Sequence, residues 1–342
     1  MNDRITLDYG SGGLKTSELI ESLLVPAFDN PALSQLGDGA LLDGSKKLVF
    51  STDSFVVSPW NFPGGDIGKL SVCGTVNDVC MAGGIPKYLS LSFILEEGFL
   101  FSDLRQIVAS IAEEVKKAGV SIVTGDTKVV DAGKGDGIYI NTAGIGFQRT
   151  DLPGKAAIRP GDDVIVSGTV GCHGAAVMMA RSGLLSEDNP LRSDCMPLHR
   201  ISAAALDAAV ATAGSESGAV RILRDPTRGG VATTLNEFTE GMPFSIELKE
   251  NEIPIEPAVE AACDMLGLDP LYCACEGRML LVCDPSATED ILEALHNVPG
   301  GENAARIGTV TEEMPGKVLL KTPIGGRRIL SKLTGIQLPR IC

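Results

Sequence analysis

The sequence predicts an α/β (α+β) protein with two domains, and three observations carry this prediction. The chain has 342 residues, which is long for a single hydrophobic core. Strand-like apolar runs alternate with stretches at helical spacing, as in mixed α/β folds. A loop-like stretch at 153–160 separates two such series and marks a domain boundary.

Composition narrows the class of protein. With 44% hydrophobic and 21% charged residues, the chain is globular rather than disordered. The 29 basic and 44 acidic residues give a net charge of −15, which argues against nucleic acid or an anionic membrane as the main partner. No run approaches the roughly 18 apolar residues of a membrane span, and the first residues do not resemble a signal peptide. We therefore expect a cytoplasmic protein.

The nine cysteines lack the spacing of a metal site or of a redox Cys-x-x-Cys motif. We expect eight of them to be reduced and mostly buried. Cys342 stands apart because it is the last residue of the sequence and follows Pro339, which cannot continue a helix. Eleven residue steps separate Ser331 from Cys342, so an extended tail could carry the thiol roughly 36–40 Å. The tail by itself favours a cysteine that stands at this position by chance over a functional thiol.

The first domain is expected over residues 1–150. Asp66 is predicted to cap a largely apolar helix over 67–81, and Ser102 a second, amphipathic helix. The other predicted elements are a helix over 14–24 and strands over 48–53, 88–94, 121–124 and 138–147, with the run 125–128 as the loop after the third strand.

The second domain is expected over residues 155–328, followed by a mobile C-terminal tail over 329–342. Strands are predicted over 163–167 and 279–283, and a helix over 231–240. His173 lies in a tight turn before another helix. It could be catalytic, but a lone histidine in a turn is more often structural.

Two segments suit phosphate. Gly12 and Gly13 belong to a glycine-rich turn ahead of a helix, where exposed backbone N–H groups bind anions, although a flexible turn is an equal alternative. The run 224–230 gathers Asp225, Thr227 and Arg228 at the start of a helix, which suits a polyphosphate with its metal. Neither segment is a Walker loop.

Four aspartates of the first domain suggest a magnesium site. Asp38, Asp53 and Asp126 lie beside glycine or near a strand end, and Asp78 interrupts an apolar helix. A buried carboxylate needs a cation, and for Asp78 we favour a metal over a structural ion pair. Because Mg²⁺ prefers hard oxygen ligands and keeps water and phosphate oxygens as the others, the four acids predict one nucleotide–Mg²⁺ site.

The sequence also resembles a known family. The resemblance covers essentially the whole chain and is carried by the runs FPGGDIGKL at 62–70, CGTVND at 73–78, GDTKVV at 125–130, DPTRGGV at 225–231 and PRIC at 339–342. These runs resemble the HypE family of hydrogenase maturation proteins. The resemblance implies the ATP-binding fold of aminoimidazole ribonucleotide synthetase and selenophosphate synthetase, a homodimer formed through the N-terminal sheets, and ATP at the domain interface.

The resemblance further implies a reaction and its partners. In that family HypF places a carbamoyl group on the C-terminal thiol, and the protein uses ATP to dehydrate this S-carboxamide to an S-cyanate. The cyano group passes to iron on the HypC–HypD complex and becomes a cyanide ligand of [NiFe] hydrogenase.

The matching positions imply roles for individual residues. Cys342 would carry the substrate group, and Glu276 with Lys128 nearby would remove a proton from the amide nitrogen. Mg²⁺ on the four aspartates would stabilise the transferring phosphoryl group. The implied nucleotide contacts are Gly12, Gly13, Lys69, Asn77, Gly125, Thr127, Asp225, Thr227 and Arg228.

The chain departs from the family pattern at three positions. Tyr9 stands where members carry His, Cys172 where they often carry Asp, and Cys275 where they often carry Asn. Three other readings stay open: an ATP-using enzyme of the same fold acting on a free small molecule, a non-catalytic scaffold for maturation partners, and a thiol-redox protein.

Overall fold

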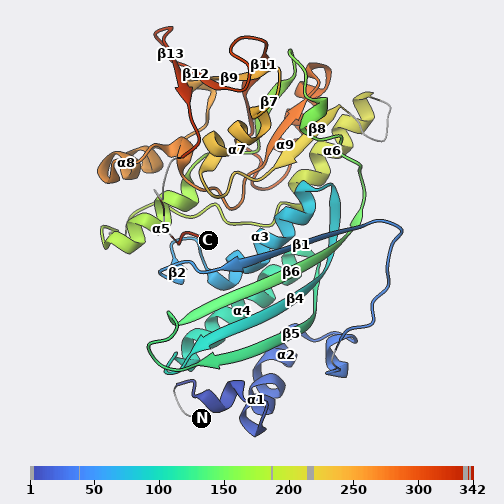
Figure 1. Ribbon diagram of the computed structural model, residues 1–342, viewed down its shortest axis with the longest axis vertical. Coiled ribbons are helices and arrows are strands. Elements are labelled where there is room, and N and C mark those ends of the chain that lie inside the picture. The colour runs from blue at the N-terminus through green and yellow to red at the C-terminus, as the bar shows by residue number, and fades with distance from the viewer. Residues whose placement is uncertain (1–3, 38, 186–187, 214–218, 334–337, 339) are drawn as a thin grey trace.

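The computed structural model describes residues 4–37, 39–185, 188–213, 219–333, 338 and 340–342. Each half of the molecule is built around its own β-sheet (Figure 1). A four-stranded sheet forms the lower half in that view, a seven-stranded sheet forms the upper half, and the C-terminus lies between them.

The N-terminal sheet has the strand order β1-β6-β4-β5, so β1 and β5 are its two edges. Only the β4–β5 pair is parallel. The strands are β1 (Leu48–Phe55), β4 (Gly84–Glu96), β5 (Ser121–Val130) and β6 (Ile138–Gln148), and a short hairpin of β2 (Asn61–Phe62) and β3 (Gly65–Asp66) precedes the first long helix.

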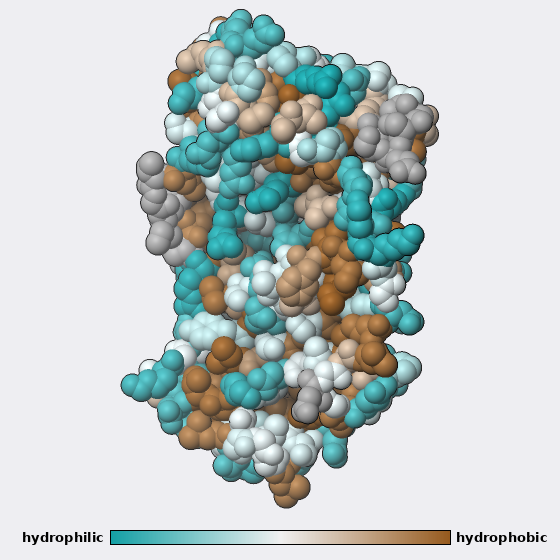
Figure 2. Space-filling view, turned by 45° about the vertical axis from the view of Figure 1, so that its right-hand side comes forward, coloured by the Kyte–Doolittle hydropathy of each residue, from teal (hydrophilic) through white to brown (hydrophobic). Residues whose placement is uncertain are grey.

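Helices cover one face of this sheet (Figure 1). They are α3 (Ile67–Met81) and α4 (Phe101–Ala118), with α1 (Leu14–Leu19), a π-helical turn at Ile20–Leu24 and α2 (Val25–Phe28) near the N-terminus. The other face exposes large apolar side chains, including Leu48 and Phe50 of β1 and Ile94 of β4. Brown hydrophobic areas are visible over the lower half of the molecule in Figure 2.

The structure confirms α3 to the residue. Asp66 caps it by accepting a hydrogen bond from the backbone N–H of Lys69 at 2.9 Å. The predicted cap of α4 is wrong, because the helix begins at Phe101 with Leu100 as N-cap, and Ser102 lies inside the first turn. The predicted helix over 14–24 exists but changes to a π-helical turn at Ile20.

The predicted loop at 125–128 is also wrong, because this run is part of β5. Gly125 stands opposite Leu91 and Lys128 opposite Ile94 in the parallel β4–β5 ladder. The ladder satisfies backbone groups that local propensity would assign to a turn. Gly125 has a packing reason as well, because a Cβ there would lie 2.4 Å from the Leu91 carbonyl oxygen.

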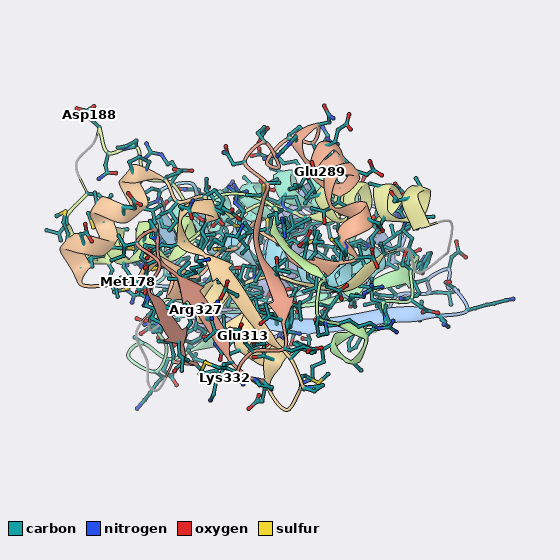
Figure 3. The ribbon with its side chains drawn as sticks, turned by 90° about the horizontal axis from the view of Figure 1, so that it is seen from above. Met178, Asp188, Glu289, Glu313, Arg327 and Lys332 are labelled. Atoms are coloured by element: carbon teal, nitrogen blue, oxygen red, sulfur yellow. The ribbon has the colours of Figure 1, made fainter. Side chains whose placement is uncertain are left out.

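The C-terminal sheet has the order β13-β12-β9-β11-β7-β10-β8. Its strands are β7 (Asp163–Val166), β8 (Val220–Arg224), β9 (Ser245–Lys249), β10 (Leu280–Cys283), β11 (Ala305–Thr311), β12 (Val318–Lys321) and β13 (Arg327–Leu330). The helices are α5 (Cys172–Ser182), α6 (His199–Ala213), α7 (Gly230–Thr239), α8 (Pro257–Leu266) and α9 (Thr288–His296). Seen from above, Arg327 of the edge strand β13 lies beside Glu313, with which it forms an ion pair at 2.6 Å (Figure 3).

Asn77 of α3 joins the two domains. Its amide nitrogen donates to the carbonyl oxygens of Glu276 at 3.1 Å and Met196 at 3.2 Å, and its side-chain oxygen accepts from the backbone N–H of Leu198 at 2.7 Å. The side chain is 1% exposed. The implied nucleotide contact at Asn77 is therefore replaced by a structural role, because both of its amide hydrogens and its oxygen already bond within the chain.

The cysteine prediction is confirmed. All nine thiols are free, eight are buried, and Cys342 is partly exposed. In the described part of the chain, no helix has the length and apolar character needed to cross a membrane.

Candidate active site between the two domains

A cavity of about 450 Å³ lies between the two domains. The first domain contributes residues of β1 and α3, and the second contributes the segment before α7, Glu276 and Cys342. The residues with candidate chemistry that line it are Asp53, Asp78, Asp225, Thr227, Arg228, Glu276 and Cys342.

Gly74 allows Asp53 and Asp78 to lie on the same side of this cavity. A Cβ at Gly74 would lie 2.9 Å from the ring of Phe55, so only glycine lets α3 pack this closely on β1. Asp78 accepts a hydrogen bond from the Ser51 hydroxyl at 2.6 Å. Burial raises the pKa of Asp53, and the negative charge of Asp78 raises it further.

Asp225 and Arg228 approach the same cavity from the turn before α7. That turn needs glycine, since Gly229 and Gly230 have φ of 80° and 60°. Burial raises the pKa of Asp225 to about 7, with a contribution from Asp78, while the Arg228 charge lowers the pKa of Asp53.

Two hydrogen bonds fix the backbone of Glu276. Its N–H donates to Asp194 Oδ1 at 3.2 Å, and its carbonyl accepts from Asn77. Its Oε1 is buried and has no hydrogen-bond partner among the described residues. Burial raises the pKa of Glu276 well above its ordinary value, and neighbouring acids add to the shift. An unpartnered carboxylate oxygen in this cavity is suited to accept a proton from a bound group.

Cys342 lines the cavity, and residues 340–342 are held beside it. The backbone N–H groups of Val56 and Ser58 donate to the carbonyl oxygens of Cys342 and Arg340, each at 3.1 Å. Burial raises the pKa of the Cys342 thiol to about 12, with Glu276 raising it and Arg228 lowering it. Residues 340–342 therefore lie against the segment after β1, with the Cys342 side chain at the cavity.

A second cavity, of about 390 Å³, lies at the other edge of the N-terminal sheet. It is lined by the N-terminal helices and by five predicted site residues, Gly12, Gly125, Asp126, Thr127 and Lys128. Lys128 donates to Asp126 at 2.9 Å, which lowers the pKa of Asp126.

The predicted single site is thus divided within one chain. Asp53 and Asp78 lie on the β1 side, whereas Asp126 lies on β5 at the opposite edge, so Asp126 does not join them. The expected Glu276–Lys128 pair is corrected for the same reason, because the two side chains line different cavities. Asp38 lies outside the described residues.

Three predicted nucleotide contacts line neither cavity, namely Asn77, which joins the two domains, Gly13 and Lys69. Gly13 is the N-cap of α1. Lys69 lies in the first turn of α3, and its Nζ donates to the Gly64 carbonyl at 3.1 Å.

The described residues hold no cluster of three or more His, Cys, Asp or Glu side chains arranged for a metal ion. The donor set still fits a nucleotide-bound Mg²⁺, which takes only one or two carboxylates and fills its shell with phosphate oxygens and water. Burial is the main cause that raises the pKa values of Asp53 and Asp225, and the negative charge of Asp78 raises both further, which is the electrostatic condition that a divalent cation relieves.

The three departures from the family pattern are accommodated by packing. Tyr9 is buried with its ring 5.8 Å from that of Phe101. Cys172 lies 3.5 Å from the Thr169 hydroxyl, and Cys275 accepts the Gly171 N–H at 3.1 Å. Sequence reasoning missed Asp194, which fixes the Glu276 backbone, because nothing in its local sequence distinguishes it.

Comparison with known proteins places this fold in a class. Residues 36–148 match the model of the AIR synthase related protein N-terminal domain, and residues 159–321 match that of its C-terminal domain. The chain is therefore a two-domain protein of the AIR synthase-related class.

Full-length relatives define the family within this class. The chain is 48% identical to "Carbamoyl dehydratase HypE" of Cupriavidus necator, over 99% of this chain and 95% of that protein. A crystal structure of the hydrogenase maturation protein HypE in complex with ATP superposes with a TM-score of 0.92 at 44% identity, over 98% of this chain and 99% of that one. A HypE–HypF complex structure matches at 42% identity with a TM-score of 0.77, over 92% of this chain and 99% of that one. The chain belongs to the HypE carbamoyl dehydratase family.

Proposed function

We propose that this protein catalyses the ATP-dependent dehydration of an S-carboxamide on its own Cys342 to an S-cyanate, for the cyanide ligands of [NiFe] hydrogenase. The observation that carries the proposal is that Cys342 lies in the same cavity as Glu276, Arg228 and the acids Asp53, Asp78 and Asp225. The substrate-bearing sulfur and the candidate catalytic groups thus share one site. Membership of the HypE family supports the same reaction.

The chemistry requires the carboxamide oxygen to become a good leaving group. ATP phosphorylates this oxygen with release of ADP, and a proton is lost from nitrogen. Loss of phosphate with the second nitrogen-bound proton then forms the C≡N bond, so that one ATP is hydrolysed for each nitrile. A nucleotide-bound Mg²⁺ supplies positive charge to the transferring phosphoryl group.

The chain's own residues have separate tasks in this reaction. Glu276 accepts the first proton from the amide nitrogen, because its Oε1 has no partner among the described residues, and the second proton leaves with the phosphate. Asp53, Asp78 and Asp225 hold the cation of the nucleotide, and Arg228 and Thr227 contact its phosphates.

The active form is proposed to be a homodimer formed through the N-terminal sheets. The uncovered sheet face exposes 54% of Leu48, 68% of Phe50 and 44% of Ile94, which is costly in water. Asp126 and Lys128 lie on that same face, since they pair with Ser92 and Ile94. Two copies meeting face to face would bring the β5 edge of one copy to the β1 edge of the other, and so could complete the divided site.

The partners follow from the reaction. HypF is the proposed carbamoyl donor, in line with the HypE–HypF complex known for a relative, and a HypC–HypD complex is the proposed cyano acceptor. We assign the chemistry to domains at 1–150 and 155–328 and the substrate group to the tail at 329–342, in a cytoplasmic protein.

Intact-protein mass tests the proposal. After incubation with HypF, carbamoyl phosphate and MgATP, the chain should gain one carbamoyl group and then lose one water only when ATP is hydrolysed. The matched control is Cys342→Ala, which should gain nothing. An adduct on that variant, or water loss without ATP hydrolysis, would contradict the proposal and favour an enzyme acting on a free small molecule.

A further inference from the structure

Two polar side chains of α5 contact the tail although neither lines the cavity. They are His173 at the start of the helix and Arg181 near its end. We propose that His173 and Arg181 are positioning residues, which hold the tail by its backbone carbonyls and thereby keep the Cys342 side chain in the cavity with Glu276. This inference rests on the proposed function for its catalytic meaning, but not for its test.

His173 is held in one tautomer. Its Nε2 lies 2.7 Å from the carbonyl oxygen of Ile341, which can only accept, so Nε2 carries the proton. Nδ1 must then accept, and it does so from the Ser193 hydroxyl at 2.8 Å. The Ser193 oxygen in turn accepts from the backbone N–H of Cys195 at 3.1 Å, which leaves its hydrogen for the ring.

The surroundings of His173 keep it neutral and fixed. Its side chain is 0% exposed, and burial lowers its pKa. The ring of Phe62 packs against it edge-on, with the ring centroids 5.2 Å apart. A buried neutral imidazole between a serine and a carbonyl acts as a rigid donor and is badly placed for proton transfer in the cavity.

Arg181 connects the tail to the segment after β1. Its Nε donates to the carbonyl oxygen of Ser58 at 2.7 Å, and its Nη2 donates to that of Arg340, also at 2.7 Å. The Ser58 N–H also donates to the Arg340 carbonyl. The Arg181 guanidinium therefore adds a side-chain link between two backbone segments that are already hydrogen-bonded to each other.

These contacts recognise the backbone of the tail. The described hydrogen bonds of the tail backbone involve the carbonyl oxygens of Arg340, Ile341 and Cys342, and the Ile341 side chain is 2% exposed. Among the described residues none donates to the Cys342 sulfur. These backbone contacts are compatible with a free thiol, a carboxamide or a cyanate on Cys342, because none of them involves the group on sulfur.

Alkylation of Cys342 measures how often the tail leaves this position. Iodoacetamide reacts with the thiolate, and burial disfavours the thiolate in the docked state. The rate of single-adduct formation at pH 8, without nucleotide or HypF, is followed by intact mass and peptide mapping. We expect His173→Leu to react about tenfold faster than wild type, the effect of losing one neutral hydrogen bond.

Control variants distinguish the loss of a specific contact with the tail from a general loss of stability. His173→Gln keeps a donor in reach of the carbonyl and should stay close to wild type. His296→Leu removes a bond of the same kind from an exposed histidine away from the tail, between His296 Nε2 and the Ala304 carbonyl at 2.9 Å, and should leave the alkylation rate unchanged. Ser193→Ala and Arg181→Met should each accelerate alkylation, which keeps the test open if His173→Leu fails to fold.

The inference is overturned if these tail-contact variants react at the wild-type rate, or if His296→Leu accelerates alkylation as much as they do. A second readout concerns the reaction itself. His173→Leu should dehydrate the carbamoylated chain more slowly with an unchanged KM for ATP, and His173→Gln should recover the rate. If the wild-type protein performs no dehydration at all, the proposed function is wrong. The alkylation rates still test whether His173 and Arg181 position the tail.

Discussion

Glu276 shows how a single side chain is prepared for proton transfer. Asn77 and Asp194 bond its backbone, and Gly277 after it allows a close approach, since a Cβ there would lie 1.8 Å from the Asp194 carbonyl oxygen. The carboxyl group itself keeps Oε1 without a partner among the described residues. The position is thus fixed while the acceptor oxygen stays available.

Replacing Glu276 by Gln should therefore separate binding from chemistry. The amide fills the same space but cannot take a proton, so we expect nucleotide affinity within about twofold of wild type and cyanate formation slower by about 10²-fold or more. Single-turnover mass measurements on the carbamoylated chain give the rate. A wild-type rate would remove Glu276 as the base.

Asp78→Asn tests the metal assignment. The amide keeps the hydrogen-bonding shape toward Ser51 but loses the negative charge that a nucleotide-bound cation requires. We expect ATP hydrolysis by the carbamoylated chain to fall by at least about 10²-fold, with an unchanged melting temperature in the absence of nucleotide. Unchanged turnover would contradict a metal role for Asp78.

Asp225 should make stability depend on pH. Its pKa rises from the ordinary 3.8 to about 7 in the folded chain, chiefly through burial. Between these values the folded state binds more protons than the unfolded state, so Asp225 costs stability as the pH rises through this range and costs most above pH 7.

The expected outcome is a pH-dependent gain for Asp225→Asn. In buffer with EDTA, the gain in melting temperature of the variant over wild type should be about 3 °C larger at pH 8 than at pH 5.5, because only part of the ionisation cost of Asp225 is present at the lower pH. Thermal unfolding at both pH values is the measurement. A gain that is equal at both would show that ionisation of Asp225 is not its cause.

At the scale of elements, α3 is the part of the fold that the sequence predicts best. Its cap, its apolar composition and its bounds over 67–81 are local properties, and the structure confirms them. β5 could not be predicted equally well, because Gly125 and Asp126 favour a turn and only pairing with β4 makes them part of a strand. The π-helical turn at Ile20–Leu24 had no signal that we recognised.

The cap of α3 also supports the site, because this helix carries both Asp78 and Asn77. Asp66→Ala should lower the free energy of unfolding by about 1 kcal/mol, since the N–H of Lys69 loses its acceptor. Asp66→Asn keeps an acceptor and should lose less than half of that. Urea unfolding of the three proteins checks the order, and equal values for the two variants would exclude the capping role.

At the scale of the whole molecule, the chemistry of the site was predictable and its geometry was not. The residue pattern pointed to a nucleotide–Mg²⁺ site that included Asp53 and Asp78 and to a polyphosphate segment at Asp225, and the family resemblance added Glu276 and Cys342. The structure brings these five to one cavity. Asp126 and Lys128 were assigned to the same place, but the strand order β1-β6-β4-β5 separates them from it. Strand order depends on contacts between distant segments, which local patterns do not contain.

A mixed-dimer experiment tests whether a second copy of the chain brings Lys128 to the cavity that contains Asp78. Asp78→Asn and Lys128→Met chains, each inactive alone, are co-expressed in equal amounts. If each site takes Asp78 from one copy and Lys128 from the other, one site of every mixed dimer is intact, and about a quarter of wild-type activity returns. If both groups act within one chain, no activity returns.

The position of the tail beside Val56 and Ser58 has a kinetic consequence. A reacting group that is covalently attached to the chain never has to be captured from solution, so its effective concentration at the site is set by the chain itself. Within the assembled dimer the dehydration step should then be first order, with no Michaelis constant for the carboxamide. Throughput would be limited by how fast each chain is reloaded and unloaded.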